Sequence, residues 1–389
     1  MAKKKIWWLV SNYPHKADIQ AGIFYKNFAE ELAKYVDLTV IAPTPASNRL
    51  LSMFSIKWKR YLNTPEKEVV NGVTILRPRY TSHPREVYIG IPHRFMLHAL
   101  KKLSLGKPDL IHSFGGYPVA MAAALYAKKF HVPLLNTFTG SDVNDYPFLG
   151  VKQNRNFKYL SDAALLNITV SDHLALQYKK LTGKNARRLY LPFSADEVPS
   201  IIKAEARKYL ELPDDKFIVL YVGYLYETKG VRELITALKD LESVKSVYAI
   251  FCGGRTGLVS KINSLKNARY EGQLPIETVM KYMKAADVLV LPSYMEGIPG
   301  VVKEAGMTGL PVIATNVGGI PELLKDGKGI LIPAKDSAAI KNAIETVMSD
   351  NQGAIDRATQ LRSFIEQNFN VSQISKDQVE IYNELVSRS

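Results

Sequence analysis

The chain has 389 residues, which is enough for two domains, and its 47% hydrophobic and 23% charged residues are typical of a soluble globular protein. This balance excludes collagen-like, low-complexity and wholly disordered chains. A single cysteine, Cys252, excludes an internal disulfide and a cysteine-based zinc site, and favours a reducing compartment. No apolar run reaches the roughly 18 residues that a membrane span requires.

The net charge of +14 is concentrated in the first half of the chain. Residues 1–198 hold 28 Lys and Arg against 14 Asp and Glu, whereas residues 199–389 hold 23 of each. This asymmetry indicates that only the first domain meets an anionic partner. Nucleic acid is a poor candidate for that partner, because no recognised nucleic-acid-binding motif is present.

Strand-like apolar runs alternate with helical patterns along the whole chain. In the first half, strands are expected at 6–10, 38–42, 110–112, 134–137 and 164–170, and helices at 24–35, 119–130 and 172–181. In the second half, strands are expected at 217–222, 247–252, 268–271, 288–291 and 312–314, and a helix at 230–241. This rhythm predicts an α/β protein with two doubly wound domains and a ligand cleft at the carboxyl ends of the strands.

Residues 50–62 predict a basic amphipathic helix within the most basic part of the chain. Its apolar residues recur at helical spacing, and three basic residues flank them: Leu50, Leu51, Phe54, Trp58, Tyr61 and Leu62, beside Lys57, Lys59 and Arg60. Such a helix suits an anionic membrane surface. The alternative is an ordinary helix that packs its apolar face inward.

The strongest functional signal is EGIPGVVKE at residues 296–304, which follows an apolar strand and enters a helix. Gly297 and Gly300 let the backbone approach a ligand closely, and the first helical amides offer a phosphate site. Glu304 lies one turn into the helix and leans back toward its start, where it can reach a hydroxyl. The amides belong to Gly300, Val301 and Val302. Carboxylates at Glu296 and Glu304 suit the neutral hydroxyls of a sugar and a ribose; the alternative is that both are solvated.

The spacing Glu296-x₇-Glu304, continued by AGMTGLPVIAT at 305–315 and GGIPE at 318–322, resembles the retaining nucleotide-sugar glycosyltransferases of family 4. The resemblance implies the GT-B fold, in which two facing Rossmann-like domains enclose a cleft. It places the acceptor on residues 1–195 and the nucleotide sugar on residues 199–371, with a last helix at about 372–389 returning to the first domain. It implies that Glu304 binds the ribose and that Glu296 contacts the donor sugar.

Residues 221–231, YVGYLYETKGV, match a second element of that family. Gly223 ends a strand, and Lys229 stands at the following turn, where its ammonium can neutralise a diphosphate leaving group. Family members usually carry an arginine where this chain has Tyr224. Arg255, at the next strand end, is the candidate replacement, and the alternative is that it faces solvent. Leu274, in EGQLP at 271–275, is the candidate for a backbone contact to the base.

In the first half of the chain the match is weaker but follows the same order. The candidates for the acceptor or the cleft are Gly22, His112, Thr139 and Asp142. Gly22 belongs to the loop after the first strand. His112 ends a strand, where a histidine is otherwise often only a satisfied polar group. Thr139 stands where many members carry a histidine, three residues before Asp142.

The resemblance implies transfer of a sugar from a nucleoside-diphosphate sugar to a hydroxyl, with the anomeric configuration retained and with Glu296, Lys229 and Glu304 as catalytic residues. No cofactor and no metal are expected, because no Asp-x-Asp motif is present. The basic first domain is expected to meet a lipid-linked or surface-glycan precursor, as in capsule, exopolysaccharide or lipopolysaccharide assembly. A cytoplasmic protein, peripheral at the inner face of the membrane, is expected.

Three alternatives stay open. The first is a catalytically inactive scaffold, which the substitutions at Tyr224, Thr139 and Phe193 allow. The second is another GT-B enzyme, such as a sugar-nucleotide epimerase or a glycan phosphorylase. The third is a non-enzymatic two-domain ligand-binding protein, which would be expected to lack paired carboxylates at a helix start.

Overall fold

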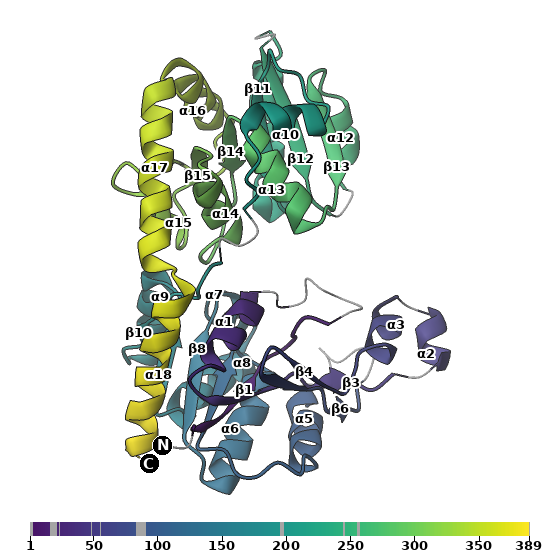
Figure 1. The fold of residues 1–389 in the computed structure, drawn as a ribbon, viewed down its shortest axis with the longest axis vertical. Coiled ribbons are helices and arrows are strands. Elements are labelled where there is room, and N and C mark those ends of the chain that lie inside the picture. The colour runs from purple at the N-terminus through teal and green to yellow at the C-terminus, as the bar shows by residue number, and fades with distance from the viewer. Residues whose placement is uncertain are drawn as a thin grey trace. The chain divides into compact units, whose positions relative to one another are not determined.

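The computed structural model of the chain describes residues 3–15, 22, 24–47, 49–54, 56–82, 91–194, 198–243, 246–254 and 257–388 (Figure 1). The chain forms two compact units. Unit 1 comprises Met1–Pro192 and Val371–Ser389, and unit 2 comprises Phe193–Asn370. The expected first division, after residue 195, lies three residues from the observed one, and the expected last helix begins one residue after the observed one.

Within its described residues, unit 1 is built on an eight-stranded sheet in the order β10-β9-β8-β7-β1-β2-β5-β4. Its strands are β1 (Lys5–Leu9), β2 (Asp37–Ile41), β4 (Lys67–Val70), β5 (Val73–Leu76), β7 (Leu110–Phe114), β8 (Leu134–Phe138), β9 (Leu166–Thr169) and β10 (Arg187–Arg188). All pairs are parallel except β4–β5. Strands β7 and β8 are buried throughout, as in a parallel sheet that is covered on both faces. A separate parallel pair is formed by β3 (Thr44–Pro45) and β6 (Arg79–Tyr80).

The helices of unit 1 pack around this sheet. They are α1 (Phe24–Leu32), α2 (Arg49–Phe54), α3 (Ile56–Leu62), α5 (Pro92–Lys101), α6 (Val119–Phe130), α7 (Ser141–Asn144), the 3₁₀ turn η1 (Tyr146–Phe148), α8 (Val151–Ala163), α9 (Asp172–Thr182) and α18 (Val371–Ser387). Helix α6 packs on α5 within one apolar core, and α18 contacts α1 and β7. The last helix of the chain therefore completes the first unit.

Unit 2, over its described residues, holds a parallel six-stranded sheet in the order β13-β12-β11-β14-β15-β16. Its strands are β11 (Phe217–Val222), β12 (Val247–Cys252), β13 (Ala268–Gly272), β14 (Val288–Leu291), β15 (Val312–Thr315) and β16 (Ile330–Ile332). Its helices are α10 (Lys203–Tyr209), the 3₁₀ turn η2 (Glu227–Lys229), α11 (Val231–Asp240), α12 (Val259–Asn263), α13 (Ile276–Ala285), α14 (Gly300–Thr308), α15 (Ile320–Leu324), α16 (Ser337–Ser349) and α17 (Asn351–Asn368). Helix α11 buries Val231, Leu234, Ile235 and Leu238, which share one helical face.

The expected single helix over residues 50–62 is wrong. Helix α2 ends at Phe54 and α3 begins at Ile56. Two hydrogen bonds anchor α3 in unit 1: Ser47 Oγ donates to the carbonyl oxygen of Trp58 at 2.8 Å, and Arg79 Nη1 donates to that of Tyr61 at 2.7 Å. These contacts bring Tyr61 beside a pocket of unit 1. In the part of the chain that the structure describes, no helix is long and apolar enough to cross a membrane.

Candidate active site

The residues of the 296–304 motif lie at the carboxyl edge of the unit 2 sheet. Strand β14 ends at Leu291, and the loop that follows carries Glu296 to the start of α14 at Gly300. Strand β11 ends at Val222, and the turn η2 that follows carries Lys229. Because β11 and β14 are adjacent parallel strands, the two loops emerge side by side.

An ion pair joins these two loops. Nζ of Lys229 lies 2.6 Å from Oε1 of Glu296, and both side chains are partly buried. Oγ of Ser293 donates a hydrogen bond of 2.7 Å to the same carboxylate oxygen. The backbone of Ser293 is held in turn, because Oγ1 of Thr315 on β15 donates to its carbonyl oxygen at 2.5 Å. The carboxylate of Glu296 is therefore oriented by three neighbouring strands.

Glycines make this close approach of loops sterically possible. Gly230 has a φ of +65°, and a Cβ at this residue would lie 1.9 Å from the carbonyl oxygen of Pro292. Gly318 has a φ of +56°, and a Cβ there would lie 1.8 Å from the carbonyl oxygen of Glu296. Both positions therefore exclude a side chain, for reasons of backbone conformation and of space. The loop of Glu296 is fixed between them.

Helix α14 begins at Gly300, directly after Pro299. The backbone N–H groups of Gly300, Val301 and Val302 lie in its first turn, where a helix has no internal acceptors for them. Glu304 is half-buried and leans back over this turn, since a Cβ added at Gly300 would lie 3.5 Å from Oε1 of Glu304. The structure thus brings Lys229, Glu296 and Glu304 to one end of one sheet.

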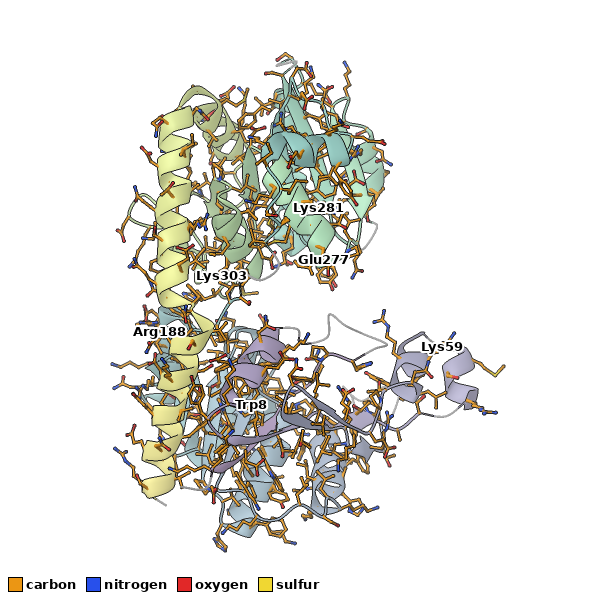
Figure 2. The ribbon with its side chains drawn as sticks, viewed as in Figure 1. Trp8, Lys59, Arg188, Glu277, Lys281 and Lys303 are labelled. Atoms are coloured by element: carbon orange, nitrogen blue, oxygen red, sulfur yellow. The ribbon has the colours of Figure 1, made fainter. Side chains whose placement is uncertain are left out.

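Lys303, the neighbour of Glu304 on α14, is buried (labelled in Figure 2). Its Nζ lies 5.0 Å from the ring centre of Phe369 and 5.5 Å from that of Phe193. Burial lowers the pKa of Lys303 to about 8, and the negative charge of Glu304 partly opposes this shift. Phe193 also donates its N–H to the carbonyl oxygen of Phe369 at 2.9 Å, so the two ends of unit 2 are held together.

The remaining donor-site candidates lie at the same edge or outside the described residues. The N–H of Gly223 donates to the carbonyl oxygen of Cys252 at 2.9 Å, which continues the pairing of β11 with β12. Tyr224 is 50% exposed, and its ring centre lies 5.6 Å from that of Tyr226. Leu274 is half-buried between β13 and α13. Arg255, the candidate replacement for the missing arginine, lies outside the described residues.

Three of the four acceptor candidates lie at the carboxyl edge of the unit 1 sheet. Gly22 packs on the loop after β1, because a Cβ there would lie 2.8 Å from the carbonyl oxygen of Asn12. Asp142 is buried, and it accepts backbone hydrogen bonds from Thr139 at 2.9 Å and from Gly140 at 2.8 Å. Burial raises the pKa of Asp142, and these hydrogen bonds oppose the rise. The Asp142 carboxylate therefore orders its own loop.

His112, the fourth acceptor candidate, lies in the core of unit 1. Its Nδ1 is 2.7 Å from the hydroxyl of Tyr382 on α18, and its Nε2 is 2.7 Å from Oγ1 of Thr137. Nε1 of Trp8 donates to the same Tyr382 hydroxyl at 2.7 Å. Burial lowers the pKa of His112 well below its usual value, so the ring is neutral. His112 is therefore a buried polar side chain with both ring nitrogens hydrogen-bonded. This was the alternative interpretation of a histidine at the end of a strand.

A pocket of about 540 Å³ at the carboxyl edge of the unit 1 sheet was not expected from the sequence. It is lined by residues after β1, β2 and β5 and by α3, among them Tyr13, His15, Tyr61, Thr64, Arg77 and Tyr80. Arg77 is 1% exposed; its Nη2 lies 2.6 Å from Oε1 of Glu68 and donates to the carbonyl oxygen of Pro14 at 2.8 Å. The sequence offered one indication of this site: Arg77 directly follows a strand, β5, and therefore lies at the carboxyl edge of the sheet.

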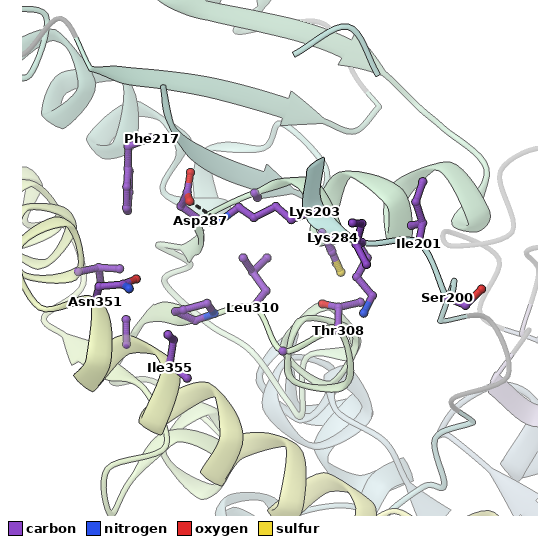
Figure 3. A pocket seen from close by; sticks show the side chains of 17 residues that line it. Ser200, Ile201, Lys203, Phe217, Lys284, Asp287, Thr308, Leu310, Asn351 and Ile355 are labelled. Atoms are coloured by element: carbon purple, nitrogen blue, oxygen red, sulfur yellow. Dashed lines mark hydrogen bonds and ion pairs between the residues drawn. The ribbon is translucent and has the colours of Figure 1, made fainter. Parts of the chain in front are cut away.

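A different pocket, of about 470 Å³, lies at the opposite edge of the unit 2 sheet, where its strands begin (Figure 3). Asp287 precedes β14 there and pairs with Lys203 and, at 2.7 Å, with Nη2 of Arg207. The carboxylate is thus already matched by two cations. Thr308 and Leu310, from the continuation of the motif, line this pocket, but no residue of 296–304 does. Over the described residues, no cluster of three or more His, Cys, Asp or Glu side chains could hold a metal ion.

Comparison with known proteins relates the chain to enzymes that transfer sugars. Residues 202–368 match the family model described as glycosyl transferases group 1. The chain is 34% identical over 346 residues to a putative teichuronic acid biosynthesis glycosyltransferase, TuaC, of Bacillus subtilis, and the match spans 87% of this chain and 88% of that relative.

Two solved structures resemble the whole chain. Sucrose-phosphate synthase from Thermosynechococcus elongatus has a TM-score of 0.81 and 23% identity, over 99% of this chain and 100% of that one. HepE of Anabaena, in complex with UDP-glucose, has a TM-score of 0.74 and 18% identity, over 98% of this chain and 100% of that one. These likenesses confirm the expected fold class, GT-B.

Proposed function

Because the chain belongs to the glycosyl transferases group 1 family, and is therefore a transferase enzyme, we propose that it moves a sugar from a nucleoside-diphosphate sugar to a hydroxyl group with retention of the anomeric configuration. One observation carries the proposal. The 2.6 Å pair of Lys229 with Glu296 joins the loops after β11 and β14, beside the first turn of α14. The ammonium of Lys229, the carboxylate of Glu296 and the first N–H groups of α14 thus lie at the same edge of the unit 2 sheet. Together they offer positive charge for a diphosphate and an acceptor for sugar hydroxyls.

The donor would be held by unit 2. The ammonium of Lys229 and the N–H groups of Gly300, Val301 and Val302 bind the diphosphate, since both present positive charge to it. Glu304 accepts hydrogen bonds from the ribose hydroxyls, and Glu296 accepts them from the sugar. Gly223 allows close approach of the backbone, and the backbone at Leu274 contacts the base. The complex of HepE with UDP-glucose, a structural neighbour, supports a nucleotide sugar as the donor.

The reaction breaks the bond between the anomeric carbon and the diphosphate oxygen and forms a bond from that carbon to the acceptor oxygen on the same face. The acceptor proton passes to the departing phosphate oxygen. Negative charge grows on the diphosphate as the bond breaks, and Lys229 and the α14 amides stabilise that charge. Glu296, whose carboxylate accepts a hydrogen bond from Ser293, holds Lys229 in place for this role. These groups supply the positive charge themselves, and we propose that the reaction uses no metal or other cofactor.

The acceptor would be held by unit 1. Its pocket combines tyrosine rings and hydroxyls, which suit a saccharide, with Arg77 and with the excess of positive charge in residues 1–198. We propose a glycan or lipid-linked precursor of a surface polysaccharide, a reading that the name of the relative TuaC supports. We further propose that the enzyme works in the cytoplasm, peripherally bound to the inner face of the membrane.

A second candidate is a catalytically inactive family member that acts as a scaffold. The half-exposed Tyr224 favours it, because the resemblance places an arginine of the phosphate site at that position. An aromatic side chain supplies no full positive charge to a diphosphate. The scaffold reading therefore predicts that nucleotide binding is lost.

Calorimetric titration with UDP, GDP, ADP and dTDP tests the proposal. One of the four is expected to bind, and Glu304→Ala is expected to weaken it by about tenfold, as loss of a charged hydrogen bond does. Glu277→Ala is the matched control, because Glu277 is an exposed glutamate in the first turn of α13 (Figure 2). If no nucleotide bound, the scaffold reading would replace the proposal. Equal weakening by both substitutions would contradict the role of Glu304.

A further inference from the structure

Three large apolar side chains are exposed together where η1 meets α8 in unit 1. Phe148 is 66% exposed, Leu149 is 71% exposed and Val151 is 88% exposed. Single exposed apolar residues are ordinary on a protein surface, but several neighbouring ones mark an interaction site. These three residues are called the apolar tip below.

The apolar tip is displayed from a well-packed base. The ring of Tyr146, in η1, stacks on that of Tyr117 with a centroid distance of 5.4 Å and an interplanar angle of 12°. The hydroxyl of Tyr146 also accepts a 3.1 Å hydrogen bond from Nδ2 of Asn156 on α8. The inward positions of α8 are filled by Phe157 and Leu160. Phe148, Leu149 and Val151 therefore face outward while the core beneath them is complete.

Basic residues surround the apolar tip. Lys152, Arg155 and Lys158 are exposed and recur every three residues, so they share one side of α8. Arg94, at the start of α5, is exposed as well. Arg94 follows His93, whose Nδ1 lies 3.1 Å from the hydroxyl of Tyr117, the residue that stacks on Tyr146. Burial lowers the pKa of His93, and the positive charges of Arg94 and Lys152 lower it further.

Acidic groups offset little of this charge. Asp145 is exposed nearby, whereas the buried carboxylate of Asp142 is occupied by backbone hydrogen bonds from Thr139 and Gly140. Residues 1–198 also carry the whole excess of positive charge of the chain. The apolar tip and its basic neighbours require a partner that is negatively charged and that accepts apolar side chains. A bilayer with acidic lipids has both properties.

We propose that the apolar tip inserts into the surface of an anionic membrane, with Arg94, Lys152 and Arg155 facing the lipid phosphates. This inference deepens the proposed function and rests on it for the choice of a lipid-linked acceptor. The start of α8 follows β8 through α7 and η1, so the apolar tip lies at the same edge of the unit 1 sheet as the 540 Å³ pocket. Docking through the tip brings that pocket to the lipid surface.

In α2 and α3, the side chains of Leu50, Leu51, Phe54 and Lys57, which belong to the predicted membrane-binding pattern, lie outside the part of the structure that is described. Within the described side chains of α2 and α3, Met53 is 80% exposed, but Trp58 and Tyr61 are half-buried and meet edge to face with a centroid distance of 5.7 Å. Tyr61 also lines the pocket. These two aromatic side chains therefore pack within unit 1. Met53 therefore serves as the matched control for the apolar tip.

Flotation of the full chain with vesicles tests the proposal. The vesicles contain phosphatidylcholine alone or phosphatidylcholine with phosphatidylglycerol. The wild type is expected to float only with phosphatidylglycerol, and less so at high salt. The triple substitution Phe148→Ser, Leu149→Ser and Val151→Ser is expected to weaken binding by about tenfold or more. Met53→Ser is expected to bind as the wild type does.

Three outcomes would overturn the proposal: no flotation of the wild type, equal flotation of the triple variant, or an equal loss with Met53→Ser. Tryptophan fluorescence of the triple variant reports whether unit 1 is folded, because Trp7, Trp8 and Trp58 all lie in that unit. Nucleotide titration of the wild type separates this proposal from the proposed function. A wild type that floats but binds no nucleotide would keep the docking surface and remove the transferase role.

Discussion

Replacement of Tyr382 by phenylalanine tests how the last helix is attached to unit 1 and what His112 does. The Tyr382 hydroxyl accepts a hydrogen bond from Nε1 of Trp8 and shares one with Nδ1 of His112, both at 2.7 Å. Nε2 of His112 shares a hydrogen bond with Oγ1 of Thr137. Trp8, His112 and Tyr382 are fully buried. Phenylalanine keeps the ring and removes only the shared hydroxyl.

The cost follows from the two partners that lose this hydroxyl. The variant leaves the N–H donor of Trp8 and Nδ1 of His112 buried without their shared partner. Each unsatisfied group costs about 1–3 kcal/mol, so the free energy of unfolding of unit 1 falls by about 2–6 kcal/mol. At a denaturant dependence of about 2–3 kcal/mol per molar urea, the unfolding midpoint falls by about 1–3 M.

Tryptophan fluorescence during urea unfolding reports unit 1 selectively, because Trp7, Trp8 and Trp58 all lie in that unit. The control is Tyr282→Phe, which removes a buried tyrosine hydroxyl in unit 2 that accepts a 3.0 Å hydrogen bond from Nη2 of Arg269. It should leave the tryptophan transition in place. An unchanged midpoint in Tyr382→Phe, with a higher KM for the acceptor, would refute the structural role of His112.

Three further predictions concern the donor site and pH. Lys229→Met should lower kcat/KM by about a hundredfold or more, because the leaving group loses its cation; nucleotide release from the donor measures this. The control is Lys335→Met, whose lysine lies over the Tyr294 ring, and an equal loss in that variant would contradict the prediction. Gly230→Ala should lower the thermal midpoint of unit 2, because its Cβ would lie 1.9 Å from a backbone oxygen, and calorimetry showing an unshifted midpoint would contradict the turn geometry. Unit 1 should lose stability as the pH falls below about 6.5, since His112 binds its proton less readily when folded than when unfolded. Urea midpoints that stay constant between about pH 7.5 and 5.5 would contradict that prediction.

Much of the secondary structure could be predicted because its signals are local. Strands β11, β12 and β14 and helix α6 have the bounds that their apolar patterns predicted. The division into two units was also visible, since the strand–helix rhythm restarts after Pro192. The apolar spacing predicted one helix over residues 50–62, whereas α2 ends at Phe54 and α3 begins at Ile56.

The candidate site could be predicted in part. The spacing of Glu296 and Glu304 follows from one strand, one loop and one helix, so it was visible in the sequence. The pocket containing Tyr13 and Arg77 was missed, because its residues come from several loops that no single motif joins. The apolar tip could not be predicted either, because nothing in the sequence indicates that Phe148, Leu149 and Val151 are exposed rather than buried.

The sequence by itself determined the two α/β units, the excess of positive charge in the first half and the residues of the donor motif, because each depends on composition or on neighbours along the chain. Only the tertiary structure decided that Lys229 meets Glu296 and that His112 lies in the core. The first contact depends on the pairing of β11 with β14. The second depends on Trp8, Thr137 and Tyr382, which surround His112 only after three strands and the last helix have packed. A side chain's partners are set by packing between distant segments, and burial then sets its charge and its chemistry.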